Sequence, residues 1–188
     1  MKCPTVCVVF LTMALMVLAA CAEKPAQAPG KTPGSGVSSA DAASIGTTVP
    51  SIVELGDMYV APETYDLKMT VAEIIRGEKS ADFLKKLGPP NLQSKTDGEY
   101  LLARVRFEYK ARGAPGDKPW ELNGVQFSAF SEDSKPYGSP SIVASQSGLK
   151  PSLRSGDTLE CWLAFVIAKS DRKPVMTFNP GGAWFRLY

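Results

Sequence analysis

An alternating run from Glu99 to Lys110 constrains the fold of this 188-residue chain more than any other feature. Apolar side chains occupy every second position: Leu101, Ala103, Val105, Phe107 and Tyr109. The intervening positions are mostly charged: Leu102, Arg104, Arg106, Glu108 and Lys110. Successive side chains of a strand point to opposite faces of its sheet. The run therefore predicts a long antiparallel strand with one buried and one wet face.

Further strand patterns occur on both sides of this run. Alternating or apolar runs of strand length cover residues 66–71, 125–129, 158–168, 175–178 and 184–188. The run 158–168 is apolar on both faces, which is typical of a central strand. Turn-forming clusters, such as 155–157 and 179–182, separate the runs. About seven strands arranged in this way predict an all-β fold, an immunoglobulin-like antiparallel β-sandwich.

One short helical insertion interrupts the strand patterns. Phe83, Leu84 and Leu87 fall on one face of a helix over residues 80–87, and a Pro-Pro pair follows at 89–90. The folded domain is expected to span residues 51–188. At that size a chain buries enough surface to fold without disulfides or metals.

The N-terminus has the layout of a secretory signal. Lys2 precedes an apolar run of about 13 residues, from Val6 to Leu18. A spanning helix needs roughly 20 residues, so a short membrane helix that stays in place is the less favoured alternative. Residues 1–20 are therefore predicted to be a signal peptide.

The end of this leader reads Leu18-Ala19-Ala20-Cys21. It resembles the bacterial lipobox, in which a Leu and two small residues precede a cysteine. The resemblance implies that Cys21 takes a diacylglycerol group, that a lipoprotein signal peptidase cuts before it, and that the new amine is acylated. Two or three acyl chains hold a protein on a membrane, whereas one binds only marginally. Cleavage of an ordinary signal beside an incidental cysteine is the alternative.

Residues 21–50 are rich in Ala, Pro, Gly, Ser and Thr and have hardly any large apolar side chains. A segment of this composition cannot bury enough surface to offset the entropy of ordering it. The lipidated cysteine is therefore expected to be followed by a disordered linker that lifts the domain off the membrane.

Composition excludes several classes of function. The chain has no histidine, which rules out Ser-His-Asp and Cys-His catalysis and removes the commonest zinc ligand. Its formal net charge is only +2, so a nucleic-acid partner is not expected. Only Cys161 lies in the expected domain, and no internal disulfide is expected with a lipidated Cys21.

Several turn and core motifs together resemble a known family. They are Gly56-Asp57, Arg76-Gly77-Glu78, Asn91 with Gly98–Leu102, Ser155-Gly156-Asp157 before Trp162 and Phe165, and Pro174–Phe178 with Trp184-Phe185. This set is similar to the telokin-like, immunoglobulin-like domain of unknown function found in secreted bacterial lipoproteins. The resemblance covers about residues 52–188. It implies a fold and no reaction.

Few side chains suggest chemistry. Cys161 lies in an apolar run with no cation beside it, which favours an inert core thiol over a reactive one. The carboxylate pairs Glu132–Asp133 and Glu73/Glu78 are interpreted as solvated charges. A glycosidase-type hydrolase would need two such groups across a cleft. The sequence predicts no catalytic residue, no cofactor and no metal site.

Two aromatic residues on expected loops are candidate partner contacts. Trp120 follows a Pro- and Gly-rich loop, and Tyr137 lies in Lys135-Pro136-Tyr137-Gly138. Aromatic side chains at the end of a sandwich suit recognition, although anchoring of the loop into the core is the simpler interpretation of each.

The sequence favours a non-enzymatic cell-envelope lipoprotein. It would be anchored by lipid to the cell membrane or outer membrane, with its domain facing the periplasm or the exterior. Loops or a sheet edge would meet a protein partner. A structural accessory subunit of an envelope complex and a carboxylate-dependent hydrolase are the alternatives.

Overall fold

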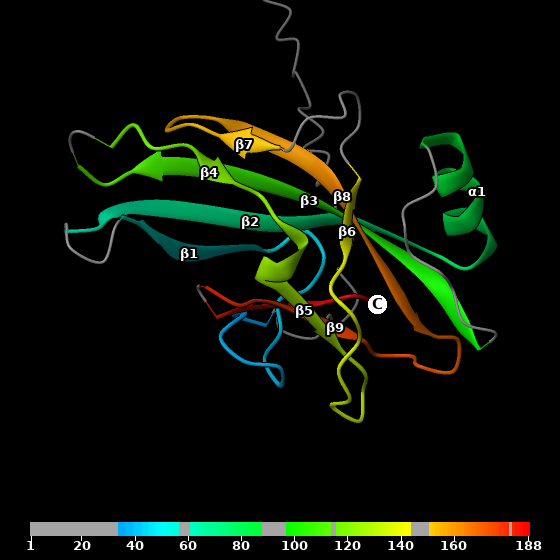
Figure 1. Cartoon of the computed structure of the whole chain (residues 1–188). Coiled ribbons are helices and arrows are strands. Elements are labelled where there is room, and N and C mark those ends of the chain that lie inside the picture. The colour runs from blue at the N-terminus through cyan, green and yellow to red at the C-terminus, as the bar shows by residue number, and fades with distance from the viewer. Residues whose placement is uncertain (1–33, 57–60, 88–96, 114–115, 144–150, 181) are drawn as a thin grey trace, which may run out of the picture. The chain divides into compact units, whose positions relative to one another are not determined.

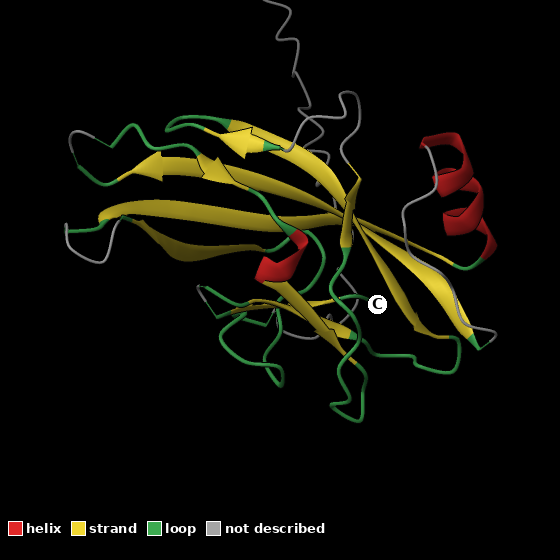
Figure 2. Ribbon diagram, viewed as in Figure 1, coloured by secondary structure: helices red, strands yellow, loops and turns green. Residues whose placement is uncertain are grey.

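The structure is a computed structural model that describes residues 34–56, 61–87, 97–113, 116–143, 151–180 and 182–188. All of these residues belong to one unit, 32–188. The expected signal peptide and Cys21 lie outside the described residues. Figure 1 labels the elements and Figure 2 distinguishes strands from helices.

The larger of two main layers is a five-stranded antiparallel sheet with the order β1-β2-β3-β8-β6. Its strands are β1 (Thr48–Leu55), β2 (Glu63–Arg76), β3 (Gly98–Ala111), β8 (Thr158–Ala168) and β6 (Ser141–Val143). The alternating run seen in the sequence is β3, and it pairs with β2 on one side and β8 on the other. β1 lies below β2 at the left of Figure 1.

The second layer is a three-stranded sheet with the order β10-β9-β5. Its strands are β10 (Ala183–Arg186), β9 (Val175–Phe178) and β5 (Phe127–Phe130), and they lie below the larger sheet in Figure 1. A two-stranded ribbon pairs β4 (Trp120–Glu121) with β7 (Ser152–Leu153). Over the described residues, the expected all-β, immunoglobulin-like antiparallel sandwich with one short helical insertion is confirmed.

The core lies between the two layers. The inward residues of β3 are almost completely buried, as the alternation predicts: Leu101, Ala103, Val105, Phe107 and Tyr109. Phe107 packs edge-on against Phe127 of β5, with ring centroids 6.1 Å apart, so the aromatic rings join the two sheets.

The helix α1 (Glu78–Leu87) covers part of the outer face of the large sheet. Phe83 packs on Trp162 with ring centroids 4.9 Å apart, and Leu84 joins Leu102 in the same apolar cluster. This cover explains why β8 is apolar on both faces. The Ser80 hydroxyl donates to the Tyr100 carbonyl oxygen at 2.6 Å and ties the helix to β3.

The C-terminal boundary expected for the disordered linker, residue 50, is wrong. Residues 34–50 were expected to be disordered, but the structure places them on the domain, and β1 begins at Thr48. Ala43 is fully buried; its N–H donates to Trp184, and its carbonyl accepts from Arg186. Backbone pairing with β10 and small side chains hold this segment, so its lack of large apolar residues was misleading. Residues 21–33 lie outside the described residues.

Candidate functional site: a groove beside a sheet edge

The strand β1 ends the five-stranded sheet and, among the described residues, pairs with β2 alone. Its residues alternate between exposed and buried, with Pro50, Ile52 and Glu54 exposed. Proline has no N–H and cannot donate to β2. Arg112 N–H donates to the Thr64 carbonyl oxygen, so the backbone groups of Thr64 face β3 and not β1. Glu54 is the register partner of Thr64, and directions alternate along a strand, so the N–H groups of Glu54 and Ile52 face away from β2. This edge can therefore accept hydrogen bonds from, and donate them to, another extended chain.

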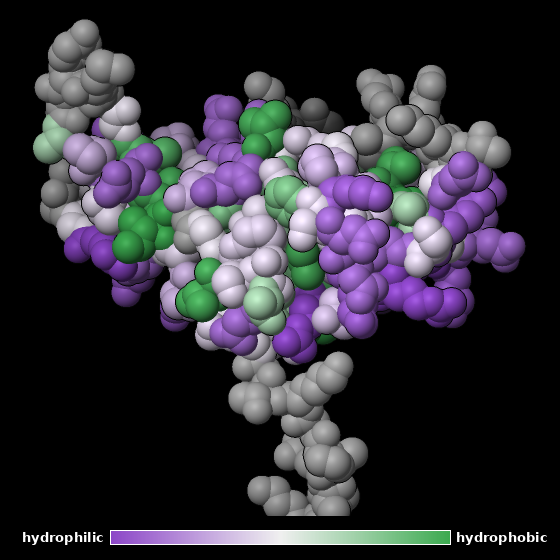
Figure 3. All heavy atoms as spheres, turned by 90° about the horizontal axis from the view of Figure 1, so that it is seen from below, coloured by the Kyte–Doolittle hydropathy of each residue, from purple (hydrophilic) through white to green (hydrophobic). Residues whose placement is uncertain are grey.

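A groove of about 1110 Å³ runs along this edge. One wall is β1, and the opposite wall comes from β4, the short helical turn η1 (Gly124–Gln126) and the β9–β10 turn. Its lining residues are Pro50–Leu55, Asp66, Arg112, Pro119, Trp120, Glu121, Gln126 and Pro180. Figure 3 views the unit from the side of the three-stranded sheet; small green apolar patches lie among purple hydrophilic residues across this face.

Two buried polar atoms in the groove lining have no hydrogen-bond partner among the described residues: Ser51 Oγ and Trp120 Nε1. Ser51 is 7% exposed and Trp120 is 2% exposed. An unpaired buried polar group costs about 1–3 kcal/mol, so native folds rarely keep one without a reason. Arg104 Nε, on the outer face of the sheet, is also unpartnered, but the guanidinium bonds Glu73 and Glu160 through its other nitrogens.

The groove lining carries more negative than positive charge. Among the described lining residues, the carboxylates are Glu54, Asp66 and Glu121, and the single cation is Arg112. Arg112 binds Asp66 at 2.7 Å. Within the described residues, no ion pair engages Glu54 or Glu121, which stand on opposite walls. The groove therefore suits a ligand with positive charge.

Trp120 is not exposed on a loop, as its interpretation as a partner contact assumed, and its contact with a partner stays a prediction. Its ring is buried among core aromatics and lies 5.8 Å from Phe107 and 5.9 Å from Phe178 between centroids. Strand pairing of β4 with β7 turns the indole inward, which the simpler interpretation of this residue anticipated. Trp120 nevertheless contributes to the groove lining, and its buried Nε1 has no hydrogen-bond partner among the described residues.

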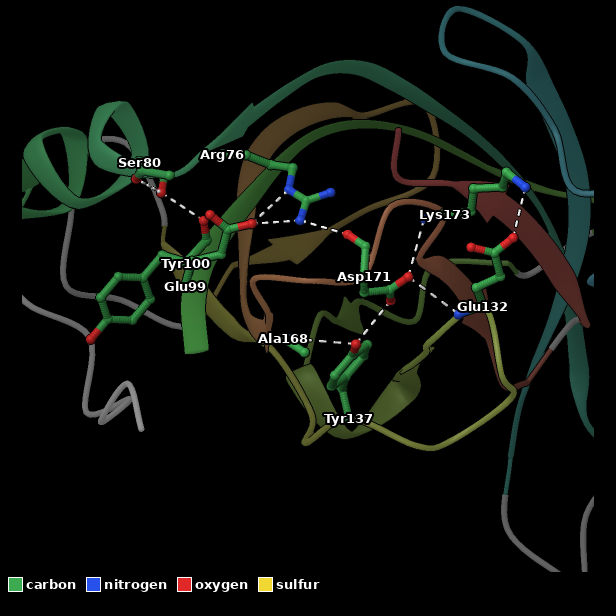
Figure 4. Close-up of polar contacts among 10 residues, drawn as sticks. Arg76, Ser80, Glu99, Tyr100, Glu132, Tyr137, Ala168, Asp171 and Lys173 are labelled. Atoms are coloured by element: carbon green, nitrogen blue, oxygen red, sulfur yellow. Dashed lines mark hydrogen bonds and ion pairs between the residues drawn. The ribbon is translucent and has the colours of Figure 1, made fainter. Parts of the chain in front are cut away.

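Tyr137 is half-buried and belongs to a polar network at another part of the fold (Figure 4). Its hydroxyl donates to Asp171 Oδ2 at 2.8 Å. Arg76 donates to the Asp171 carbonyl oxygen at 2.8 Å and to Glu99 Oε1 at 3.0 Å. The network ties two loops to β2 and β3. Because the Tyr137 hydroxyl already donates a hydrogen bond within the fold, we assign Tyr137 a structural role.

The carboxylate pairs noted in the sequence have other roles. Glu73 forms an ion pair with Arg104, and Glu132 forms one with Lys173 at 2.7 Å. Glu78 lies in the first turn of α1, where a negative charge favours the helix. In the portion of the chain that the structure describes, no three acidic or thiol side chains gather as a metal site requires.

Cys161 is a buried free thiol in β8. Burial raises the pKa of this thiol to about 12, so the reactive thiolate is scarce at neutral pH. The predicted core location is thus confirmed.

The groove itself was not predicted. Its lining comes from segments spread between Pro50 and Pro180, which only the tertiary fold brings together. The sequence signals that could have identified its edge strand are Pro50 and Glu54, since proline and charge are typical of an edge strand.

No helix within the described ranges is long and apolar enough to cross a membrane.

No family model and no curated protein matches the chain. Among solved structures, the Bacillus subtilis protein YcdA, described as a candidate lipoprotein, is similar with 13% identity over 64% of this chain and a TM-score of 0.41. The chain spans about a third of that protein's length, 35%. The secreted Mycobacterium tuberculosis protein MPT63 has 12% identity, covers 72% of this chain and 88% of its own, and gives a TM-score of 0.44. Likenesses this distant carry no conclusion about function.

Proposed function

We propose that this chain is an exported, lipid-anchored interaction module whose β1 groove receives an extended segment of a partner polypeptide. The observation that carries the proposal is the open edge of β1 lying inside a groove of about 1110 Å³. A peptide that adds a strand to a free edge gains affinity from main-chain hydrogen bonds and specificity from alternate side chains.

The anchor rests on the sequence alone. An apolar leader ending in Leu18-Ala19-Ala20 places Cys21 where a lipobox cysteine stands. Lipid there would hold the chain on the cell membrane or the outer membrane, with the sandwich in the periplasm or outside the cell. A partner in the same compartment would then be captured at the membrane surface.

Site-specific photo-crosslinking in intact cells tests the binding mode. A benzophenone amino acid replaces Ile52, which is 41% exposed in the groove lining, in the full-length chain. The matched control replaces Ile45, an isoleucine that is 44% exposed and is not among the lining residues. We expect the Ile52 probe to join one short, contiguous segment of a partner, identified by mass spectrometry of the crosslinked peptide.

The proposal fails if the Ile52 probe gives no crosslink, or gives the same products as the Ile45 probe. Crosslinks to several segments far apart in a partner's sequence would also contradict it, since an added strand is one extended segment.

Metabolic labelling with an alkyne analogue of palmitate tests the anchor. The wild-type chain should take up the label and fractionate with membranes. The Cys21→Ser variant should lose both properties. A variant that keeps the label would overturn the assignment of Cys21.

A further inference from the structure

We infer that the segment received by the β1 groove alternates basic side chains with small, hydroxyl-bearing, β-branched side chains such as threonine. This inference rests on the proposed function and adds the chemistry of the partner. It follows from the two different surfaces that β1 presents to a strand beside it.

The period of a strand determines which side chains of the partner meet which surface. Side chains of an added strand point alternately to the outer face of the sheet and into the sandwich. On β1 the outer positions are Pro50, Ile52 and Glu54, and the inner positions include Ser51 and Val53. One set of the partner's side chains therefore lies beside Glu54, and the other enters the groove.

The outer positions favour cations. Glu54 is exposed, and no ion pair holds it within the described residues. Asp66, the register partner of Ile52 on β2, is already bound by Arg112 and adds no uncompensated charge. Lys68, the register partner of Pro50, is an exposed cation beside the other end of β1, so the unpaired negative charge on this face lies at Glu54. Glu121 stands on the opposite wall within reach of the groove rim. A lysine or arginine on the partner would offset charge that the groove itself leaves uncompensated.

The inner positions favour a small side chain that carries one oxygen. The inner wall is formed by Val53, Leu55 and the edge of Trp120, so it is largely apolar. Beneath this wall lie the unpaired Ser51 Oγ and Trp120 Nε1, which the free fold closes to solvent. Threonine supplies a methyl group for the apolar wall and a hydroxyl oxygen that accepts a hydrogen bond. Its β-branched shape suits an extended backbone.

The inference is tested with synthetic peptides of the length of β1, by isothermal titration of the full-length chain in detergent micelles. The probe alternates lysine and threonine. Its first comparison alternates lysine and valine, which has the shape of threonine without the hydroxyl. Its second comparison alternates glutamate and threonine, which reverses the charge.

We expect the lysine–threonine peptide to bind most tightly. Loss of the hydroxyls should weaken binding about threefold to tenfold, because buried donors are left unpaired. Each of Glu54→Gln and Glu121→Gln should weaken binding by about twofold to fivefold at low salt, and added salt should reduce both effects. The control Asp133→Asn removes an exposed carboxylate outside the groove lining and should leave affinity unchanged.

The inference is overturned if the glutamate–threonine peptide binds as well as the probe, if the three peptides bind alike or none binds, or if Asp133→Asn weakens binding as much as Glu54→Gln. The crosslinking experiment separates the two proposals. A single segment trapped at Ile52 together with any of these results leaves the strand-binding function standing and removes only its basic, hydroxyl-bearing chemistry.

Discussion

Ser51 and Trp120 line the same groove from two different sheets, and neither Ser51 Oγ nor Trp120 Nε1 has a hydrogen-bond partner among the described residues. Both atoms are closed to solvent in the free chain, and we infer that a partner strand in the groove satisfies them. Their removal should affect stability and binding in opposite directions.

The Ser51→Ala variant tests this opposition. Because the hydroxyl is buried and unpaired, its removal should leave the free energy of unfolding unchanged or raise it by up to about 1 kcal/mol. The same variant should bind the lysine–threonine peptide more weakly than the wild type. Urea unfolding and isothermal titration give the two values. A clear loss of stability would show that the hydroxyl is satisfied within the fold.

The Tyr137→Phe variant should destabilise the fold without changing peptide binding. It removes the donor to Asp171 Oδ2, and Asp171 is only 9% exposed. Hydrogen bonds to buried carboxylates are strong, so the free energy of unfolding should fall by about 1–3 kcal/mol. The control Tyr188→Phe, at a residue 44% exposed, should change it by less than about 0.5 kcal/mol. If urea unfolding shows the same loss of unfolding free energy for Tyr137→Phe and Tyr188→Phe, the network does not stabilise the fold.

Cys161 should resist alkylation while the chain is folded. Burial raises the pKa of its thiol from 9.0 to about 12, which favours the neutral form in the folded state. The associated stability is complete below the unfolded pKa of about 9 and is lost as the pH rises toward 12. At pH 8, mass spectrometry of the peptide containing Cys161 should show iodoacetamide labelling only in urea. Rapid labelling of the native chain would contradict this burial.

The contribution of Glu63 should depend on pH. The hydroxyl of Tyr65 and the ammonium of Lys118 hold the pKa of this carboxyl below its usual 4.5. A lowered folded pKa gives stability that is present above pH 4.5 and is lost as the pH falls through the folded value. The difference in unfolding free energy between wild type and Glu63→Gln should therefore shrink on acidification. A difference that is constant with pH would show that the charge is not involved.

Local pattern was enough to predict the central strands. The alternation of β3 identified its buried face from Leu101 to Tyr109, because a strand with one wet face alternates apolar and polar residues. It also located β8 and α1. Short strands such as β4 and β7, of two residues each, have no room for a period and were missed.

Tertiary contacts account for the remaining differences. Ala43 is held by backbone hydrogen bonds to β10, which leave no apolar signal in the sequence. Trp120 follows a turn-rich loop and nevertheless packs inward, because its two-residue strand pairs with β7. The groove combines both difficulties, since its walls come from segments distant in sequence and its lining includes Trp120 of a two-residue strand.

Amide hydrogen exchange measured by NMR tests the central claim, strand addition at β1, most directly. The N–H groups of Ile52 and Glu54 face away from β2, whereas those of Ser51 and Val53 point toward it. Saturating lysine–threonine peptide should slow exchange at Ile52 and Glu54 and leave Ser51 and Val53 nearly unchanged. Peptide binding that leaves the Ile52 and Glu54 amides as fast as in the free chain would contradict the account.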